Sequence, residues 1–220
     1  MVEISKILYF DTLGLQNTEN VVAAVKERIM KGDIEHVIVC SIAGRTALSI
    51  ADAIKDFNVH ICCVSGTASW QIHGYEWPLM RGKLRERLER LKVDIIERTP
   101  STLSGDTIDY GLARYGWIPA SWIVAETLEL VDGYGLKTAV EGVLVATDSE
   151  IVPPYVKAIS VAGTGSGANT AIVAKSTYSA CMFSRDPDRR FQILEILAMP
   201  KYKKWHEAID AGEFHIEETK

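Results

Sequence analysis

The sequence predicts an α/β fold of three layers, α/β/α, in which helices cover both faces of a mostly parallel central sheet. Short apolar segments rich in Val and Ile alternate along the chain with longer segments of helical period. This order is typical of parallel strands joined by crossover helices. The apolar segments have no alternating polar positions, as expected of strands buried on both faces. With 220 residues, of which 47% are hydrophobic, the chain has the size of one α/β domain, and no linker divides it.

The first half of the chain shows the clearest alternation. A short strand at 7–10 precedes a helix that begins at Asn17 or Thr18 and stops at Gly32, because Asn and Thr cap helix N-termini and Gly ends helices. The next strands and helices are expected, in turn, at 36–40, 44–57, 59–64, 79–92 and 93–97. The segment 65–78 has no period, and a loop of this length in a compact domain is more often functional than idle.

The second half begins with two consecutive helices, broken by Gly133 and Gly135. The strand "AISVA", a glycine-rich loop and the strand "TAIVAK" follow, and "FQILEILAMP" predicts the last strand. Residues 201–220 are predicted to be a charged C-terminal extension of a single domain that spans 1–220.

Composition argues against several classes of protein. The net charge of −5 is not that of a nucleic-acid-binding surface, which needs a concentrated basic face. The four cysteines include no Cys-x-x-Cys pair, as expected of buried thiols in a reducing cytosol. No apolar run has the length of a signal peptide or a membrane span. A cytoplasmic protein without a membrane partner is therefore expected.

The segment "VCSIAGRTALSIA" predicts a phosphate-binding loop. Here a strand leads through a short loop into a helix, so that loop N–H groups and the positive end of the helix dipole face the same way. Ser41 and Thr46 add hydroxyl groups, and Arg45 adds a guanidinium suited to phosphate oxygens. The alternative is an ordinary capped helix with a surface arginine.

The segment "KAISVAGTGSGANTAIVAK" contains glycines at 163, 165 and 167. Such density indicates a backbone with positive φ, or one that something approaches closely. The dinucleotide fingerprint is excluded, because its last glycine is missing and a strand rather than a helix follows. The alternative is a tight hairpin without a ligand. Because ligands of such sheets bind beyond the carboxyl ends of the strands, we expect this loop and the 41–46 loop to share one pocket.

Other candidate groups are more ambiguous. Trp70, Tyr75 and Trp77 offer a stacking wall for a flat ligand, or simply pack the 65–78 loop. Glu141 is the charged residue in an apolar stretch of helix, and it is either paired with a core arginine or directed at a ligand. The five histidines have no ligand spacing, and no metal site is expected.

Several spaced motifs resemble known proteins. "HVIVCSIAGRTALSIADAI" and "AISVAGTGSGANTAIVA" are similar to the two effector loops of the pyruvate kinase C-terminal domain. With "LSG" at 103–105 and "VAETLELVDGYGLKTAVE", nearly the whole chain resembles a family of small, mostly archaeal stand-alone proteins built on that domain. Members of that family have no settled activity and are associated with bound flavin mononucleotide (FMN). A histidine commonly precedes "LSG" in the family, where this chain has Ser101, so the resemblance implies no catalytic role there.

The motifs and the resemblance together give the candidate cofactor-binding residues. These are Ser41, Ile42, Ala43, Gly44, Arg45, Thr46, Ser65, Gly66, Leu103, Ser104, Glu141, Gly163, Thr164, Gly165, Gly167 and Asn169.

Three functions are consistent with these residues. The first is an FMN-binding protein, or one that binds a similar phosphorylated small molecule. The second is a non-catalytic sensor of a sugar phosphate or nucleotide, and the third is a flavin-dependent oxidoreductase. Pyruvate kinase activity is excluded, since the chain is shorter than the catalytic barrel alone. A homo-oligomer is expected.

Overall fold

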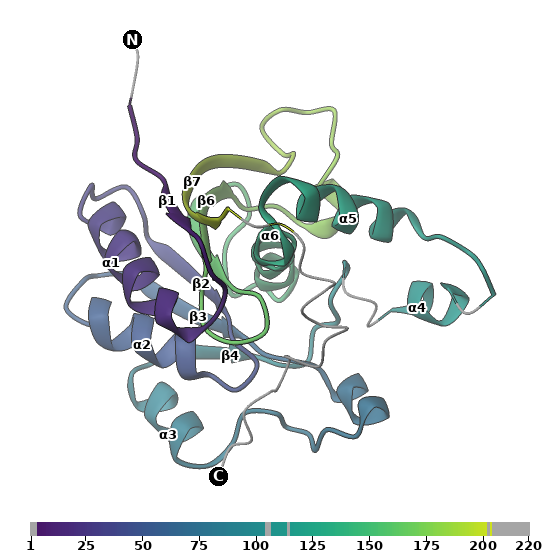
Figure 1. The fold of residues 1–220 in the computed structure, drawn as a ribbon, viewed down its shortest axis with the longest axis horizontal. Helices are drawn as coiled ribbons and strands as arrows, with labels where there is room; N and C mark the ends of the chain where they lie inside the picture. The colour runs from purple at the N-terminus through teal and green to yellow at the C-terminus, as the bar shows by residue number, and fades with distance from the viewer. Residues whose placement is uncertain (1–3, 104–106, 114, 202, 204–220) are drawn as a thin grey trace.

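A seven-stranded sheet forms the centre of the molecule, with the strand order β1-β7-β6-β5-β2-β3-β4 (Figure 1). This computed structural model describes residues 4–103, 107–113, 115–201 and 203. The strands are β1 (Leu8–Phe10), β2 (His36–Cys40), β3 (His60–Val64), β4 (Asp94–Ile96), β5 (Lys157–Ala162), β6 (Thr170–Lys175) and β7 (Gln192–Pro200). β6 runs antiparallel to both of its neighbours, and every other pair in the sheet is parallel. The expected three-layer α/β fold with a mostly parallel sheet is confirmed.

Helices cover the two faces of the sheet (Figure 1). One face carries α1 (Thr18–Ile29), α2 (Arg45–Ile54) and α3 (Gly82–Arg90), and the other carries α5 (Ala120–Asp132) and α6 (Tyr134–Asp148). α4 (Ile108–Ala113) stands out from the body beside α5, and 3-10 turns lie at Leu15–Asn17 (η1), Ala68–His73 (η2) and Ser179–Cys181 (η3). No helix in the described part of the chain is long and apolar enough to cross a membrane.

Each face of the sheet has its own apolar cluster. Alternate residues of β2 contribute to opposite clusters: Val37 and Val39 pack towards α1 and α2, and Ile38 packs towards α6. All three are fully buried, as the uninterrupted apolar sequence of this strand predicts. The two layers of helices therefore hold the sheet from both sides.

α6 lies unusually close to the sheet because of two glycines. A Cβ atom at Gly142 would lie 2.3 Å from the Sγ atom of Cys40, and one at Gly135 would lie 2.2 Å from the Oγ1 atom of Thr170. The sequence-based prediction that both Gly133 and Gly135 break the helices was therefore wrong at Gly135, which lies inside α6. Only Gly133 separates the two helices, with a φ of 82°.

Other element boundaries shift by a few residues, and α4 and the three 3-10 turns were not expected. The helix predicted at 79–92 spans Gly82–Arg90, and α4 and η3 were missed because their sequences lack a helical period. Of the predicted C-terminal extension, 202 and 204–220 lie outside the described residues.

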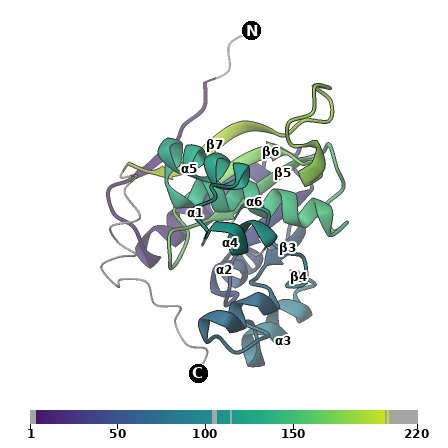
Figure 2. The same ribbon diagram turned by 90° about the vertical axis from the view of Figure 1, so that its right-hand side faces the viewer.

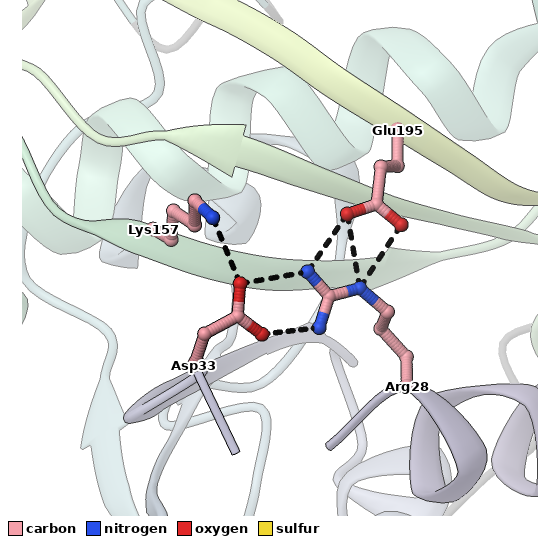
Figure 3. Close-up of polar contacts among 4 residues, drawn as sticks. All are labelled: Arg28, Asp33, Lys157 and Glu195. Atoms are coloured by element: carbon pink, nitrogen blue, oxygen red, sulfur yellow. Dashed lines mark hydrogen bonds and ion pairs between the residues drawn. The ribbon is translucent and has the colours of Figure 1, made fainter. Parts of the chain in front are cut away.

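An ion-pair network ties α1 to the amino edge of the sheet (Figure 3). The Arg28 guanidinium donates to both carboxylates that face it, with Nη1 2.6 Å from Asp33 and Nη2 2.7 Å from Glu195 of β7. Lys157 of β5 also donates to Asp33, at 2.8 Å. Arg28 is 5% exposed, and its hydrogen bonds hold the pKa of Asp33 well below its usual range.

Removing this guanidinium should destabilise the fold. We expect Arg28→Ala to lower the free energy of unfolding by about 2–3 kcal/mol, less than for a fully buried pair because Asp33 and Glu195 retain solvent contact. Since the pKa of Asp33 is depressed in the folded state, part of this difference should be present above about pH 4 and shrink as the pH falls below it. Urea unfolding at several pH values measures both effects. Arg189→Ala, at an exposed ion pair, is the control and should change stability by less than about 0.5 kcal/mol.

Candidate functional site

The two glycine-containing loops leave the sheet from neighbouring strands at the same edge. β2 and β5 pair in parallel, with Val39 opposite Val161, so the loops that follow them, 41–46 and 163–169, begin side by side at the carboxyl edge. The segment after β3 begins one strand further along, and there the Ser65 hydroxyl donates to the carbonyl of Ile42 at 2.7 Å. The structure thus brings three of the predicted segments together.

The 41–46 loop ends in an uncapped helix N-terminus. α2 begins at Arg45 with Gly44 as its N-cap, in a left-handed conformation (φ 86°) and without a side-chain capping hydrogen bond. The alternative of an ordinary capped helix with a surface arginine therefore stays open, since Gly44 is the N-cap and Arg45 is on the surface. Arg45 is exposed, whereas Thr46 is buried, and Ser41, Ile42 and Ala43 are half-buried. Backbone N–H groups, a hydroxyl and a guanidinium are thus concentrated at one helix end.

Packing within the chain also accounts for Gly44. A Cβ atom there would lie 2.9 Å from Leu88 and 3.0 Å from Met80. A similar argument holds at Gly66, where a Cβ atom would lie 2.3 Å from Leu79. These two glycines are therefore required by their neighbours, whether or not a ligand approaches.

The glycine loop is likewise shaped by its own contacts. A Cβ atom at Gly163 would lie 2.1 Å from the carbonyl oxygen of Gly167, and one at Gly167 would lie 2.8 Å from the Cα atom of Leu15. Thr18 completes the contact, since its hydroxyl accepts a hydrogen bond from the N–H of Ala168 at 3.0 Å. The group that comes close to these two glycines is therefore the chain itself. Gly165 (φ 75°) is exposed and remains the glycine open to a ligand.

Asn169 ends this loop with an unsatisfied polar group. The residue is 1% exposed, and its Oδ1 atom accepts a hydrogen bond from Thr170 at 3.1 Å. Its Nδ2 atom is buried and finds no hydrogen-bond acceptor among the described residues. A buried donor without an acceptor costs about 1–3 kcal/mol, and such groups are usually explained by a bound water, ion or ligand. Thr164, in the same loop, is also buried.

Glu141 is held by protein groups. It is buried, forms an ion pair with Lys137 at 3.5 Å, and accepts hydrogen bonds from the N–H of Leu103, at 2.8 Å, and from the Ser101 hydroxyl. Of the two alternatives left open, the paired carboxylate is the one observed, with a lysine in place of the expected arginine. Leu103 is an apolar core residue, and Ser104 lies outside the described residues.

Further buried polar residues near the N-terminus of α6 were missed by the sequence-based reasoning. Lys137 is 3% exposed and its Nζ atom lies 4.4 Å from the centre of the Tyr134 ring. Asp132 is fully buried, 3.9 Å from Lys203, and burial raises its pKa to about 8. The i, i+4 spacing of Lys137 and Glu141 in an apolar helix was the signal that could have revealed the pair.

Two of the three predicted aromatic residues of the 65–78 loop, Trp70 and Tyr75, pack against each other. Trp70 and Tyr75 have ring centroids 5.4 Å apart in a tilted arrangement. Trp70 also lies close to Gly66 of the same loop, since a Cβ atom at Gly66 would lie 3.2 Å from its ring. Loop packing is therefore observed, and a stacking surface for a ligand remains a prediction.

Two of the histidines, His36 and His60, form a cluster with Asp94 at the amino edge of the sheet, opposite the candidate site. The Nδ1 atoms of His36 and His60 lie 3.2 Å apart, and the Nε2 atom of His60 lies 2.7 Å from Asp94. These residues begin β2, β3 and β4, so the cluster is separated from the candidate site by the length of the strands. Across the described residues, no group of His, Cys, Asp or Glu side chains could hold a metal ion.

No protein-family model matches the chain. The candidate site is therefore defined by its geometry: two loops from paired strands, an uncapped helix N-terminus and a buried, unsatisfied amide at one edge of the sheet.

Replacing Asp132 should change how stability depends on pH. Because its pKa is about 8 in the folded chain and about 4 in an unfolded one, the folded state binds the proton more tightly. The contribution of Asp132 to the stability of the wild type should be greatest below about pH 4 and decrease as the pH rises towards 8, by at most about 1.4 kcal/mol per pH unit. Asp132→Asn should lack this decrease, as measured by chemical unfolding across the range. If Asp132→Asn kept the decrease, Asp132 would not be its source; Asp188→Asn, at an exposed carboxylate, is the control.

The glycine loop offers a second test. Gly167→Val should destabilise the ligand-free fold by about 2–3 kcal/mol, because its side chain would meet the backbone of η1 and force a strained φ. Gly165→Ala, at an exposed position of similar φ, should cost only about 1–2 kcal/mol. Thermal unfolding of both variants measures the difference. Equal losses would show that η1 does not pack on the loop as described.

Proposed function

We propose that the carboxyl edge of β2, β3 and β5 binds a phosphorylated small molecule of mononucleotide size, with FMN as the first candidate. The observation that carries this proposal is the uncapped N-terminus of α2 beside the glycine loop of the neighbouring strand. In open α/β sheets, ligands bind at such strand ends, and phosphates bind at helix N-termini.

The residues present are compatible with an FMN phosphate. The first-turn N–H groups of α2 would donate hydrogen bonds to its oxygens, with hydroxyl groups from Ser41 and Thr46 and the guanidinium of Arg45 nearby. The unsatisfied Nδ2 atom of Asn169 would donate to a polar part of the ligand further along the edge. When bound, FMN would supply a redox-active ring. The two loops also resemble the effector loops of the pyruvate kinase C-terminal domain, and this resemblance supports a phosphorylated ligand.

A non-catalytic sensor of a sugar phosphate or nucleotide is the second candidate. The phosphate-binding features of the 41–46 loop are not specific for a flavin. Glu141 is engaged by Lys137 and by the 101–103 segment, which favours a structural role for a carboxylate whose alternative role was to face a ligand. Under this proposal the ligand would bind without being turned over.

Analysis of the purified protein separates these functions. A flavin absorption band, with FMN identified by mass spectrometry after denaturation, is expected under the first proposal. Anaerobic reduction of that flavin by NAD(P)H with turnover would add an oxidoreductase activity. A colourless protein that binds neither FMN nor any sugar phosphate or nucleotide in calorimetry would contradict both proposals.

Arg45 provides the most direct test of the phosphate position. Hydrogen bonds to charged groups contribute roughly 1.5–3 kcal/mol, so Arg45→Ala should weaken FMN binding about ten- to a hundredfold. Because Arg45 is exposed, stability without ligand should change by less than about 0.5 kcal/mol. Riboflavin, which lacks the phosphate, should bind to the wild type and the variant equally. Titrating both ligands into both proteins measures this, and equal losses for the two ligands would mean that Arg45 shapes the loop and does not contact phosphate.

A further inference from the structure

At its C-terminal end, the helix α5 places carboxylates on its inner side and apolar residues on its outer side. A surface helix normally turns its apolar stripe towards the core and its charged residues towards solvent. In α5 the carboxylates of Glu129 and Asp132 point inward and are 5% and 0% exposed, whereas Leu130 and Val131 are 79% and 52% exposed. The inward carboxylates belong to the polar cluster at the start of α6, where Glu129 acts electrostatically on Lys137. Nothing in the described part of the chain covers the outward Leu130 and Val131.

Exposed apolar side chains also lie on α4 and in the described part of the segment between α4 and α5. Ser121 donates a hydrogen bond to Asp109 at 2.9 Å, which ties the two helices together. Figure 2, which turns this side towards the viewer, shows α4 and α5 in front of α6. We call this surface the α4–α5 apolar face; its large side chains, each 41–83% exposed, are Ile108, Leu112, Tyr115, Trp117, Ile118, Ile123, Leu130 and Val131.

The size of this face matches what a stable protein interface needs. If a fully exposed large side chain presents roughly 150–200 Å², these eight residues expose on the order of 1,000 Å² of apolar surface. The largest apolar patch of an ordinary monomer is about 300–600 Å², and a standard interface buries about 800 Å² on each partner. Trp, Tyr and aliphatic residues are also the types that fill interface cores.

The charge of this segment argues for a protein partner over a lipid surface. Amphipathic helices that bind membranes carry Lys and Arg along their polar face. Between 107 and 131 the sequence contains one basic residue, Arg114, against the acidic residues Asp109, Glu126 and Glu129, and the whole chain carries a net charge of −5. An anionic membrane would repel this surface.

We propose that a second copy of this chain covers the α4–α5 apolar face in a symmetric dimer. A two-fold axis places the same patch on both subunits, so each copy supplies the apolar area that the other requires. The arrangement at the end of α5 is then explained: Glu129 and Asp132 join the polar cluster beside α6, and Leu130 and Val131 are buried in the dimer.

The test compares two lysine substitutions in the face with one outside it. Ile118→Lys/Leu130→Lys places two charges where the copies would meet, and both positions are more than two-thirds exposed in the single chain, so the fold should survive. Phe183→Lys, at a residue 75% exposed beyond η3, is the matched control. Sedimentation equilibrium gives the mass of each protein, and circular dichroism with thermal unfolding reports whether each is folded.

We expect the wild type and the control to have twice the chain mass of 24.3 kDa, and the double variant to be a folded monomer. Its dimer dissociation constant should rise at least about a hundredfold, because buried unpaired charges are costly in an apolar interface. A wild type that remains monomeric through the micromolar range, or that forms an assembly of another size, overturns the proposal. A double variant that stays dimeric like the control also overturns it. Should the double variant be unfolded, Ile118→Ser alone must weaken the dimer for the proposal to stand.

Discussion

The close contact between α6 and the sheet is the constraint on which much of this structure depends. At Gly135 and Gly142 any larger side chain would push the helix away from β6 and β2. Because the helix lies so near, the Ser160 hydroxyl reaches the carbonyl of Ala139 at 2.8 Å, and the Cys40 thiol reaches that of Thr138 at 3.2 Å. These side chains are satisfied by the helix backbone, and burial raises the pKa of Cys40 to about 12. The contact also fixes the start of α6 next to Asn169, at the edge where the site loops lie.

Burying α6 so completely has an electrostatic consequence. Lys137 and Glu141 lie within a helix that has almost no solvent contact, so each needs the other. The pair in turn holds the segment after β4 through Leu103, and further carboxylates on α5 face the same region. The polar cluster therefore joins three segments of the chain: α5, α6 and the segment after β4. It also accounts for the inward position of Glu129 and Asp132 on α5. The candidate site lies near the start of α6, and the exposed apolar face lies on the outer side of α5, so both border this polar cluster.

The strands could be predicted closely, because burial on both faces leaves a local signal. The runs at 36–40 and 170–175 have the predicted limits, and Val37 or Ile172 could hardly lie anywhere but in a covered sheet. The sequence also predicted that the 41–46 and 163–169 loops share one edge, because both follow strands of a mostly parallel sheet. The role of the glycines could not be predicted, because the neighbours of Gly167 lie in η1 and at the start of α1, far away in sequence. Likewise, the i, i+4 spacing of Lys137 and Glu141 could have revealed their ion pair. The hydrogen bond from Leu103 to Glu141 could not be predicted, because it depends on how α6 packs against the segment after β4.

The parallel pairing of β1 with β7 bears on where a tag or label can be attached to this protein. Leu8 lies opposite Ala198 and Phe10 opposite Pro200, so the chain enters β1 at the amino edge of the sheet and leaves β7 at the carboxyl edge. A purification tag or fluorescent label joined ahead of β1 would thus attach a strand length away from the candidate site. A reporter inserted directly after Pro200 would instead attach at the carboxyl edge, on the same edge of the sheet as the candidate site and two strands away from β5. The direction of one short edge strand thus makes the chain ahead of β1 the better place for a reporter in a binding experiment.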